Sequence, residues 1–259
     1  MEKLGIIGGL GPAATAQLFT QIVKYTDADC DQDHLDITIL NRPSIPDRTA
    51  YLLGKPGAAS FVEPMQEAAR KLEAFGCTVI ATPCNTAHAR LDAIALVLDR
   101  ARFVDMPKAA AAFAGKLGCA RVGVLATDGA LASGVYQQAL ASVGAESVLP
   151  DKRVQAMVMS IIYDEVKAGR PVSSEKVKNV CDALTDAECD GIILGCTELS
   201  LLGLPRRRGE TFIVDALDVL AWTCVTECGA KARSLTDEYR YPDIDGEGRT
   251  GHAADGSIE

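Results

Sequence analysis

The sequence has no long apolar run, no excess of basic residues and no secretory signal. No stretch approaches the roughly 20 apolar residues that cross a bilayer, so we expect no membrane span. The formal net charge of −9 argues against a nucleic-acid partner, which would favour clustered basic residues. Met1–Leu4 leads straight into an apolar run, without the basic, apolar and small-residue order of a signal peptide. We therefore expect a cytoplasmic protein.

Paired metal-ligand motifs are also missing. The nine cysteines include no CxxC pair, and the closest pair, Cys224/Cys228, has no second pair of the same spacing. There are only three histidines, one of them near the end of the chain. Without a secretory signal, the cysteines are expected to be reduced thiols rather than a disulfide framework. The sequence thus predicts no metal site.

Strand-like apolar runs alternate with helical stretches along the chain. Its 259 residues, 48% hydrophobic and 24% charged, suffice for a sizeable core. The alternation runs through Lys3–Gly8, Ala13–Tyr25, Leu35–Leu40, Asp47–Leu53, Val62–Phe75, Thr78–Ala81, Arg121–Ala126, Gly134–Val143, Val154–Lys167, Ser174–Asp186, Gly191–Leu194 and Val214–Ala230. This order predicts an α/β fold of mostly parallel sheets flanked by helices, with ligands bound beyond the carboxyl ends of the strands.

The two halves of the chain resemble each other weakly. Gly5–Gly11 and Gly123–Gly129 both join a strand to small residues. Phe75–Thr86 aligns with Ala187–Glu198, and each contains a strand that ends in a cysteine. A repeat of this kind predicts two similar lobes, with the active site in the cleft between them.

The predicted lobes divide near Lys108–Gly118. We expect an N-terminal lobe over residues 1–112 and a C-terminal lobe over residues 113–242, whose last helix can pack back on the first lobe. Residues 243–259 are rich in glycine and charge, and are expected to form a mobile tail.

Cys84 and Cys196 differ from the other cysteines in their position. Each follows a predicted strand and precedes a helical stretch, where backbone N–H groups and the helix dipole favour a thiolate. A buried free cysteine is more often a small hydrophobic residue, and we interpret the others in this way. The residues next to these two cysteines are polar, and this favours a functional role for both cysteines. These neighbours are Asn85, Thr86, Thr197 and Glu198.

A glycine-rich loop, Gly8–Pro12, follows the first strand. Gly9, Gly11 and Ala14 have the spacing of a dinucleotide-binding fingerprint, but the second strand ends at Asn41 rather than at an acidic residue. A loop whose N–H groups receive a carboxylate explains the glycines equally well. On that hypothesis Gly9 and Leu10 are candidate substrate-binding residues. A nicotinamide-dependent oxidoreductase remains the alternative.

Two basic residues are candidates for binding an anionic substrate. Arg48 follows Asp47, a possible helix cap, and a fixed guanidinium can bind a carboxylate through two hydrogen bonds. An ordinary exposed arginine in a first helical turn fits the sequence equally well. Lys167, by its sequence context alone, is more often a last-turn lysine before a glycine.

The sequence resembles the aspartate/glutamate racemase family, and especially its aspartate racemases. The resemblance rests on Gly8–Pro12, Pro46–Thr49, Pro83–His88, Val166–Gly169 and Gly195–Glu198, which follow the family's order. It implies two α/β lobes with the active site between them, no pyridoxal phosphate or other cofactor, and a homodimer. Two departures leave the substrate preference open: Leu10 stands where methionine is common, and Ala89-Arg90 where an aromatic residue is frequent.

The resemblance also implies roles for individual residues. Cys84 and Cys196 correspond to the two catalytic cysteines. The α-carboxylate end of the substrate is held at the positions of Asn85, Thr86 and Thr197, and its side-chain carboxylate faces those of Arg48 and Lys167. Thr127, in the second lobe's counterpart of the glycine loop, completes the candidate substrate-binding residues.

The expected reaction is interconversion of L- and D-aspartate, an acidic amino acid. Glutamate is the nearest rival substrate, since apolar contacts discriminate one methylene only modestly. Other two-cysteine relatives, such as a hydantoin racemase or a maleate isomerase, also stay open, as does a non-catalytic amino-acid-binding protein.

Overall fold

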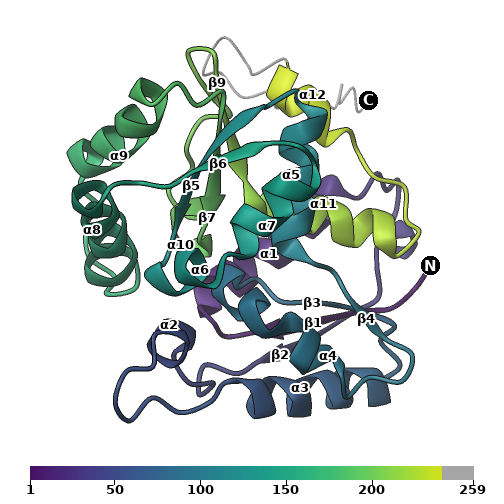
Figure 1. The fold of residues 1–259 in the computed structure, drawn as a ribbon. Coiled ribbons are helices and arrows are strands. Elements are labelled where there is room, and N and C mark those ends of the chain that lie inside the picture. Colours follow the sequence, from purple (N-terminus) through teal and green to yellow (C-terminus); the bar gives the residue numbers. More distant parts are fainter. Residues whose placement is uncertain (241–259) are drawn as a thin grey trace, which may run out of the picture.

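The computed structural model describes residues 1–240 and contains two mostly parallel sheets flanked by helices (Figure 1). The α/β prediction is confirmed. The predicted mobile tail, residues 243–259, lies outside the described residues. None of the helices within residues 1–240 combines the length and the apolar character needed to cross a bilayer.

The two sheets have matching strand orders. In the first, β2-β1-β3-β4, all strands are parallel: β1 (Leu4–Gly8), β2 (Ile37–Asn41), β3 (Val79–Ala81) and β4 (Arg102–Phe103). The second, β6-β5-β7-β9-β8, contains β5 (Arg121–Ala126), β6 (Glu146–Val148), β7 (Gly191–Gly195), β8 (Arg207–Arg208) and β9 (Thr211–Asp215). Among these strands β8 alone runs antiparallel. The weak sequence repeat thus corresponds to a repeat of topology: β3 and β7, which precede Cys84 and Cys196, occupy equivalent places.

Helices cover both faces of each sheet. The first half contains α1 (Pro12–Tyr25), a 3₁₀ turn η1 (Asp31–Asp33), α2 (Arg48–Leu52), α3 (Val62–Ala74), the 3₁₀ helix η2 (Asn85–Arg90), α4 (Leu91–Ala95) and α5 (Met106–Lys116). The second contains α6 (Asp128–Ser133), α7 (Val135–Ser142), α8 (Lys152–Ser160), the π-helix η3 (Ile161–Val166), α9 (Ser174–Asp186), α10 (Thr197–Ser200), α11 (Ala216–Glu227) and α12 (Leu235–Arg240). The strands β1 and β7 are buried along their whole length, as expected for central strands of covered parallel sheets.

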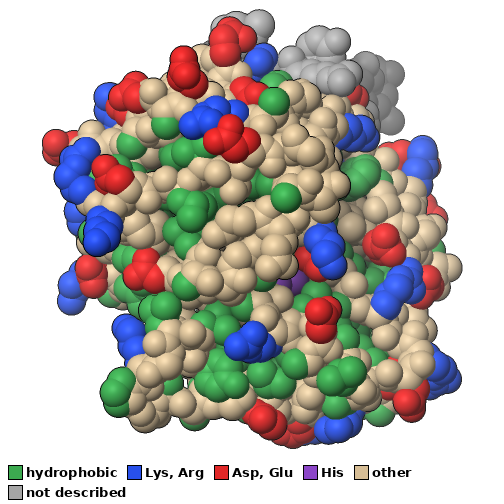
Figure 2. All heavy atoms as spheres, in the orientation of Figure 1, with side chains coloured by type: hydrophobic (Ala, Val, Ile, Leu, Met, Phe, Trp, Pro, Cys, Tyr) green, Lys and Arg blue, Asp and Glu red, His purple; other side chains and the backbone are tan. Residues whose placement is uncertain are grey.

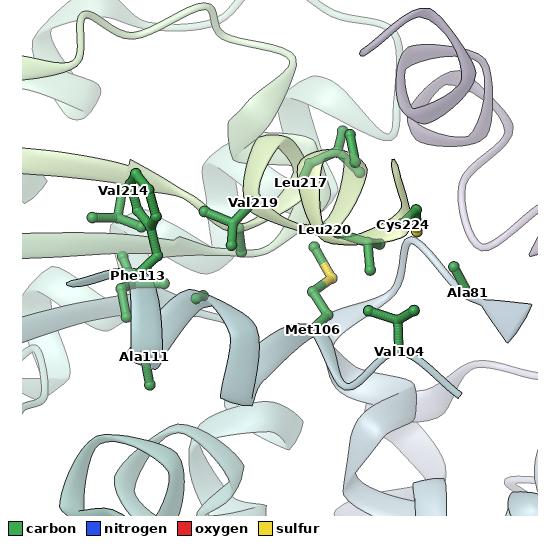
Figure 3. Close-up of a cluster of buried hydrophobic side chains, with 14 of the residues drawn as sticks. Ala81, Val104, Met106, Ala111, Phe113, Val214, Leu217, Val219, Leu220 and Cys224 are labelled. Atoms are coloured by element: carbon green, nitrogen blue, oxygen red, sulfur yellow. The ribbon is translucent and has the colours of Figure 1, made fainter. Parts of the chain in front are cut away.

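The largest hydrophobic cluster joins the two lobes. α5 and α11 pack against each other between the sheets (Figure 1), with Met106 and Leu220 among the side chains in contact with this cluster (Figure 3). The same cluster includes Ala81 from β3 and Val214 from β9. α11 also packs on α1. The division expected between residues 112 and 113 falls inside α5, so both sides of this boundary contribute to one core, and the boundary stays a prediction.

The predicted helix Val154–Lys167 differs from the observed structure. α8 ends at Ser160, and the chain continues as the wider π-helix η3 to Val166. Such turns occur often at functional sites. Tyr163 and Lys167, within and just after this turn, both line the cavity between the lobes.

Candidate active site

One nearly closed cavity lies where the carboxyl ends of β3 and β7 meet between the lobes. It leaves only about 10 Å³ of free space, close to the least that holds one water molecule. Its lining includes nine of the predicted site residues, namely Leu10, Arg48, Cys84, Asn85, Thr86, Thr127, Lys167, Cys196 and Thr197. Gly9 is not part of the lining.

The two cysteines occupy equivalent positions. Cys84 is the N-cap residue of η2 and Cys196 that of α10, and both are 5% exposed. Because these helices have only six and four residues, their dipoles are short. The expected stabilisation of a thiolate is not found at Cys196. Burial, followed by the charge and hydrogen bond of Glu198, raises the pKa of the Cys196 thiol well above its usual value.

Glu198 connects Cys196 to Lys167. The Cys196 thiol donates to Glu198 Oε2 at 2.9 Å, while Glu198 Oε1 forms an ion pair with Lys167. Glu198 is 5% exposed, and the Lys167 side chain is 26% exposed. Burial opposes the charge on Lys167, but the neighbouring Glu198 outweighs it and raises the pKa of the lysine.

Arg48 is held by backbone carbonyls beside Cys84. It begins α2, where Asp47 is the N-cap through a 2.6 Å bond from the Ala50 N–H. Its guanidinium donates to the carbonyls of Ile45, Pro46 and Leu10 at 3.4, 3.1 and 3.1 Å. Burial opposes its charge, but interaction with Cys84 raises the pKa of Arg48. Nε is buried and has no partner within residues 1–240. Arg48 is therefore a fixed cation of the cavity rather than an exposed first-turn residue.

Asn85, Thr86 and Thr127 supply polar groups from both lobes. Tyr136, in α7, donates its hydroxyl to Asn85 Oδ1, and the buried Asn85 Nδ2 has no partner among the described residues. Thr86 and Thr127 share a hydrogen bond of 2.8 Å between their hydroxyls. Thr127 also caps α6. An unpaired buried N–H group favours a ligand that accepts hydrogen bonds, such as a carboxylate.

The glycine loop has a packing role at Gly9. This residue has a φ of +94°, and a Cβ there would lie 2.5 Å from the backbone of Arg42. Its N–H already donates to Thr15 Oγ1 at 2.9 Å. The expectation that the Gly9 N–H receives a substrate carboxylate is therefore not supported by the geometry. Leu10 does line the cavity, and its carbonyl holds Arg48.

His88 braces the turn that carries Cys84. It is buried; its Nδ1 lies 2.9 Å from the Cys84 carbonyl, and its Nε2 lies 3.1 Å from the N–H of Met106. The Met106 N–H can only donate, so Nε2 accepts, and the ring proton is on Nδ1. Burial lowers the pKa of His88, in keeping with a neutral ring.

A protein-family model, Asp/Glu/Hydantoin racemase, matches residues 7–224. The chain belongs to this family. Membership implies an isomerase, a racemase, that acts on a small molecule of the amino-acid class. The chain is 26% identical over 231 residues to the broad specificity amino-acid racemase RacX of Bacillus subtilis (strain 168), covering 86% of this chain and 96% of RacX.

Solved structures of racemases have the same fold. Picrophilus torridus aspartate racemase matches with a TM-score of 0.76 and 27% identity, over 94% of this chain and all of that one. Glutamate racemase RacE1 of Bacillus anthracis matches with a TM-score of 0.57 and 20% identity, over 90% and 85% of the two chains. The second likeness concerns the fold alone.

Three residues of this racemase-family cavity were not predicted as site residues: Thr49, Tyr163 and Glu198. Glu198 had a signal, since it follows Cys196 in the motif and aligns with Thr86 in the repeat. Tyr163 had none, because its position depends on the π-helix. Its hydroxyl donates to Asp47 Oδ2 at 3.2 Å across the cleft.

A larger groove adjoins the cavity. It has a volume of about 570 Å³ and shares Thr49 and Tyr163 with the cavity lining. Within residues 1–240, no three His, Cys, Asp or Glu side chains gather closely enough to hold a metal ion. On the face drawn in Figure 2, basic and acidic side chains are interspersed.

Proposed function

We propose that this protein is a cofactor-independent aspartate racemase in which Cys84 and Cys196 transfer protons at opposite faces of the α-carbon. The observation that carries the proposal is that these two cysteines, at equivalent strand ends of two lobes, line one cavity with Arg48 and Lys167. The similarity to an aspartate racemase over the whole of that chain supports the choice of aspartate.

Racemisation needs a base on one face of the α-carbon and an acid on the other. One thiolate removes the α-proton, and the opposite thiol donates its proton to the other face. For the other enantiomer the roles exchange. The two thiols must differ in protonation at any instant, so their titrations are coupled.

The carbanion must be stabilised by donors directed at the α-carboxylate, which gains enediolate character. The unpaired Asn85 Nδ2, the hydroxyls of Thr86 and Thr197 and the backbone N–H groups at the starts of η2 and α10 are suited to this role. Thr127 orients Thr86 through their shared hydrogen bond.

Arg48 and Lys167 suit the distal carboxylate of the substrate. Arg48 donates three hydrogen bonds to backbone carbonyls. A guanidinium has five N–H groups, so two remain, one of them on Nε, to bind a carboxylate. These contacts would bind and orient the substrate at a point distant from the reacting carbon. Because the cavity has so little free space, a bound substrate must either displace the Glu198 side chain or fit beside it. The groove bordered by Tyr163 is the proposed route by which the substrate reaches the cavity.

We further propose a cytoplasmic homodimer. All nine cysteines are free thiols, which suits a reducing compartment. Exposed Phe19 and Val23 on α1 and Ile39 on β2 offer apolar surface for a second copy. Sedimentation equilibrium would test the dimer.

The decisive experiment is incubation with L-aspartate, and separately with L-glutamate, in D2O without added cofactor. Deuterium at the α-carbon and loss of optical rotation are expected, with aspartate turned over faster. Activity with many neutral amino acids would instead indicate a broad racemase like RacX. Binding of aspartate without α-exchange would indicate a non-catalytic binding protein, and tight equilibrium binding of NAD would favour an oxidoreductase.

The two-cysteine assignment has its own test. Cys84→Ala and Cys196→Ala should each abolish racemisation, because each direction needs both thiols. Cys181→Ala is the matched control, since this buried cysteine lies in α9 away from the cavity. Racemisation at the wild-type rate in either cavity variant would refute the mechanism.

A further inference from the structure

We infer that Glu198 is a positioning residue that sets which thiol carries the proton before substrate binds: it holds Cys196 as the thiol and leaves Cys84 as the resting base. The inference rests on the proposed racemase function and deepens it. It distinguishes two cysteines that occupy equivalent positions, by naming the one that is the base in the resting site.

The carboxylate of Glu198 is placed to keep a proton on Cys196. Glu198 Oε2 accepts from the Cys196 thiol at 2.9 Å, and an ionised carboxylate can only accept. Its other oxygen is held by Lys167, so the side chain cannot easily turn away. Gly11, at the start of α1, packs close behind it: a Cβ there would lie 3.4 Å from Glu198 Oε1.

No carboxylate stands at the equivalent place beside Cys84. In the sequence repeat Cys84 aligns with Cys196, and Thr86 aligns with Glu198. Thr86 is neutral and bonds to Thr127. The fixed charge near Cys84 is instead the guanidinium of Arg48, which is always protonated and is locked by three backbone carbonyls. One thiol therefore faces an anion and the other a cation.

The surroundings of Cys196 strengthen this difference. With about 10 Å³ of free space, water can do little to screen the charges. Cys196 faces the titratable groups Glu198, Lys167, Tyr136 and Tyr163, and Cys84 lines the same cavity. Burial raises the pKa of both tyrosines, which stay neutral. Lys167 offsets part of the anionic charge, but burial and Glu198 together outweigh it.

In one turnover the substrate C–H bond breaks and its proton joins the Cys84 thiolate, and the Cys196 thiol then gives its proton to the opposite face of the carbanion, which completes the inversion. The enzyme is left with a Cys84 thiol and a Cys196 thiolate beside Glu198. It returns to rest when Cys84 releases a proton to solvent and Cys196 takes one up, or by turnover of the other enantiomer. The resting protein is thus prepared for the enantiomer whose α-proton faces Cys84.

The test is alkylation of the substrate-free protein with iodoacetamide near neutral pH, followed by mass spectrometry of the Cys84 and Cys196 peptides. Both thiols line one cavity, so the reagent must enter the same space to reach either of them. The rate at each thiol therefore serves as a control for reagent access to the other. In the wild type we expect Cys84 to react faster, and Cys196 to need a higher pH to reach half its maximal rate, because burial and Glu198 raise the pKa of the Cys196 thiol. In Glu198→Gln the rate at Cys196 should rise by about tenfold or more, because the neutral amide no longer opposes ionisation of the thiol.

Two further variants separate charge from fold. Glu165→Gln removes the same charge from another buried glutamate, which is paired with Lys176 outside the cavity lining, and should leave the Cys84/Cys196 rate ratio unchanged. Glu198→Asp keeps the charge and should keep Cys196 slow. If Glu198→Gln does not fold, the wild-type pH profiles and Glu198→Asp still decide the matter.

Equal rates at the two thiols in the wild type, or an unchanged ratio in folded Glu198→Gln, would overturn the inference. Its failure is distinguishable from failure of the proposed function. A protein that racemises aspartate but labels both thiols equally refutes this inference alone. A protein that labels as expected but exchanges no α-proton refutes the proposed reaction alone.

Discussion

His88 joins the Cys84 turn to the start of α5 through both ring nitrogens. Only the neutral ring can donate from Nδ1 and accept at Nε2 together, so protonation would break the bond from Met106. The charged groups near the ring are Asp105, which favours protonation, and Lys108, which opposes it. Burial outweighs both and lowers the pKa of His88 from its ordinary value of 6.5.

This lowered pKa gives a pH-dependent contribution to stability. As the pH falls below about 6.5, the unfolded chain takes up the His88 proton before the folded chain does, so the free energy of unfolding falls. We expect it to fall more steeply below about pH 6.5 in the wild type than in His88→Gln, which cannot titrate. Urea unfolding at several pH values measures this. His34→Gln is the matched control, because His34 is half-buried in a loop outside both sheets. Parallel pH profiles of wild type and His88→Gln would contradict the assignment.

At the scale of elements, the π-helix η3 controls one side of the cavity. It places Tyr163 between the cavity and the groove, with its hydroxyl bonded to Asp47 at the start of α2. Tyr163→Phe removes this bond between the lobes and should raise the alkylation rates of Cys84 and Cys196 together, by about two- to fivefold. A parallel rise distinguishes easier opening from the altered ratio expected for Glu198→Gln.

Tyr51→Phe is the control for this prediction. Tyr51 lies in α2 and packs edge-on against Phe61, with ring centroids 5.3 Å apart, outside the cavity lining. It should leave both alkylation rates unchanged. If Tyr163→Phe also leaves them unchanged, the contact between Tyr163 and Asp47 does not limit access.

The elements that could be predicted from sequence are those whose burial is uniform. β1, β3 and β7 read as apolar runs because helices cover both faces of their sheets, and the ends of β3 and β7 locate Cys84 and Cys196. The two-residue strands β4 and β8 are too short to leave a pattern. Nor does periodicity distinguish the π-helix η3 from an α-helix, since its six residues are too few to show a period.

Side-chain roles were predictable only where the motif carried them. For the cysteines, position and polar neighbours already favoured a function, but the roles proposed for them and for Arg48 rest on the family's motifs, since local physics left Arg48 open between a ligand and a surface residue. Gly9 shows the limit of such reasoning: a glycine required by the close approach of Arg42 looks the same in sequence as one required by a ligand. Glu198 was visible, but its bonds to Cys196 and Lys167 depend on tertiary structure.

At the scale of the whole molecule, Arg206 connects α12 to the core. It forms ion pairs with Asp218 in α11 and Glu238 in α12, and it donates to the hydroxyls of Tyr25 and Tyr239 at 3.2 Å each. The side chains of Arg206 and Asp218 are 19% and 5% exposed. Breaking a buried pair leaves a charge without compensation, which costs more than the pair itself contributes.

Arg206→Met should therefore lower the free energy of unfolding by about 3–5 kcal/mol. Arg102→Met is the control, because Arg102 pairs with Glu2 and Glu227 at the surface, where ion pairs contribute little. Urea unfolding of both variants measures the difference. Similar losses in the two variants would mean that the Arg206 cluster is no more important than a surface pair.

The matched strand orders of the two sheets raise the question of how the enzyme's kinetic constants compare for the two enantiomers. L- and D-amino acids have equal free energies in water, so the equilibrium constant of any racemisation is unity. The Haldane relation then requires the two enantiomers to have equal kcat/KM, whatever the enzyme's architecture. The duplicated lobe is therefore not the source of this equality, and a side chain present on one side only, such as Glu198, cannot alter the ratio. It can only make kcat and KM larger for one enantiomer than for the other, both by the same factor. The asymmetry of the site would then appear as a difference in both kcat and KM between the enantiomers, with the ratio of the two constants unchanged.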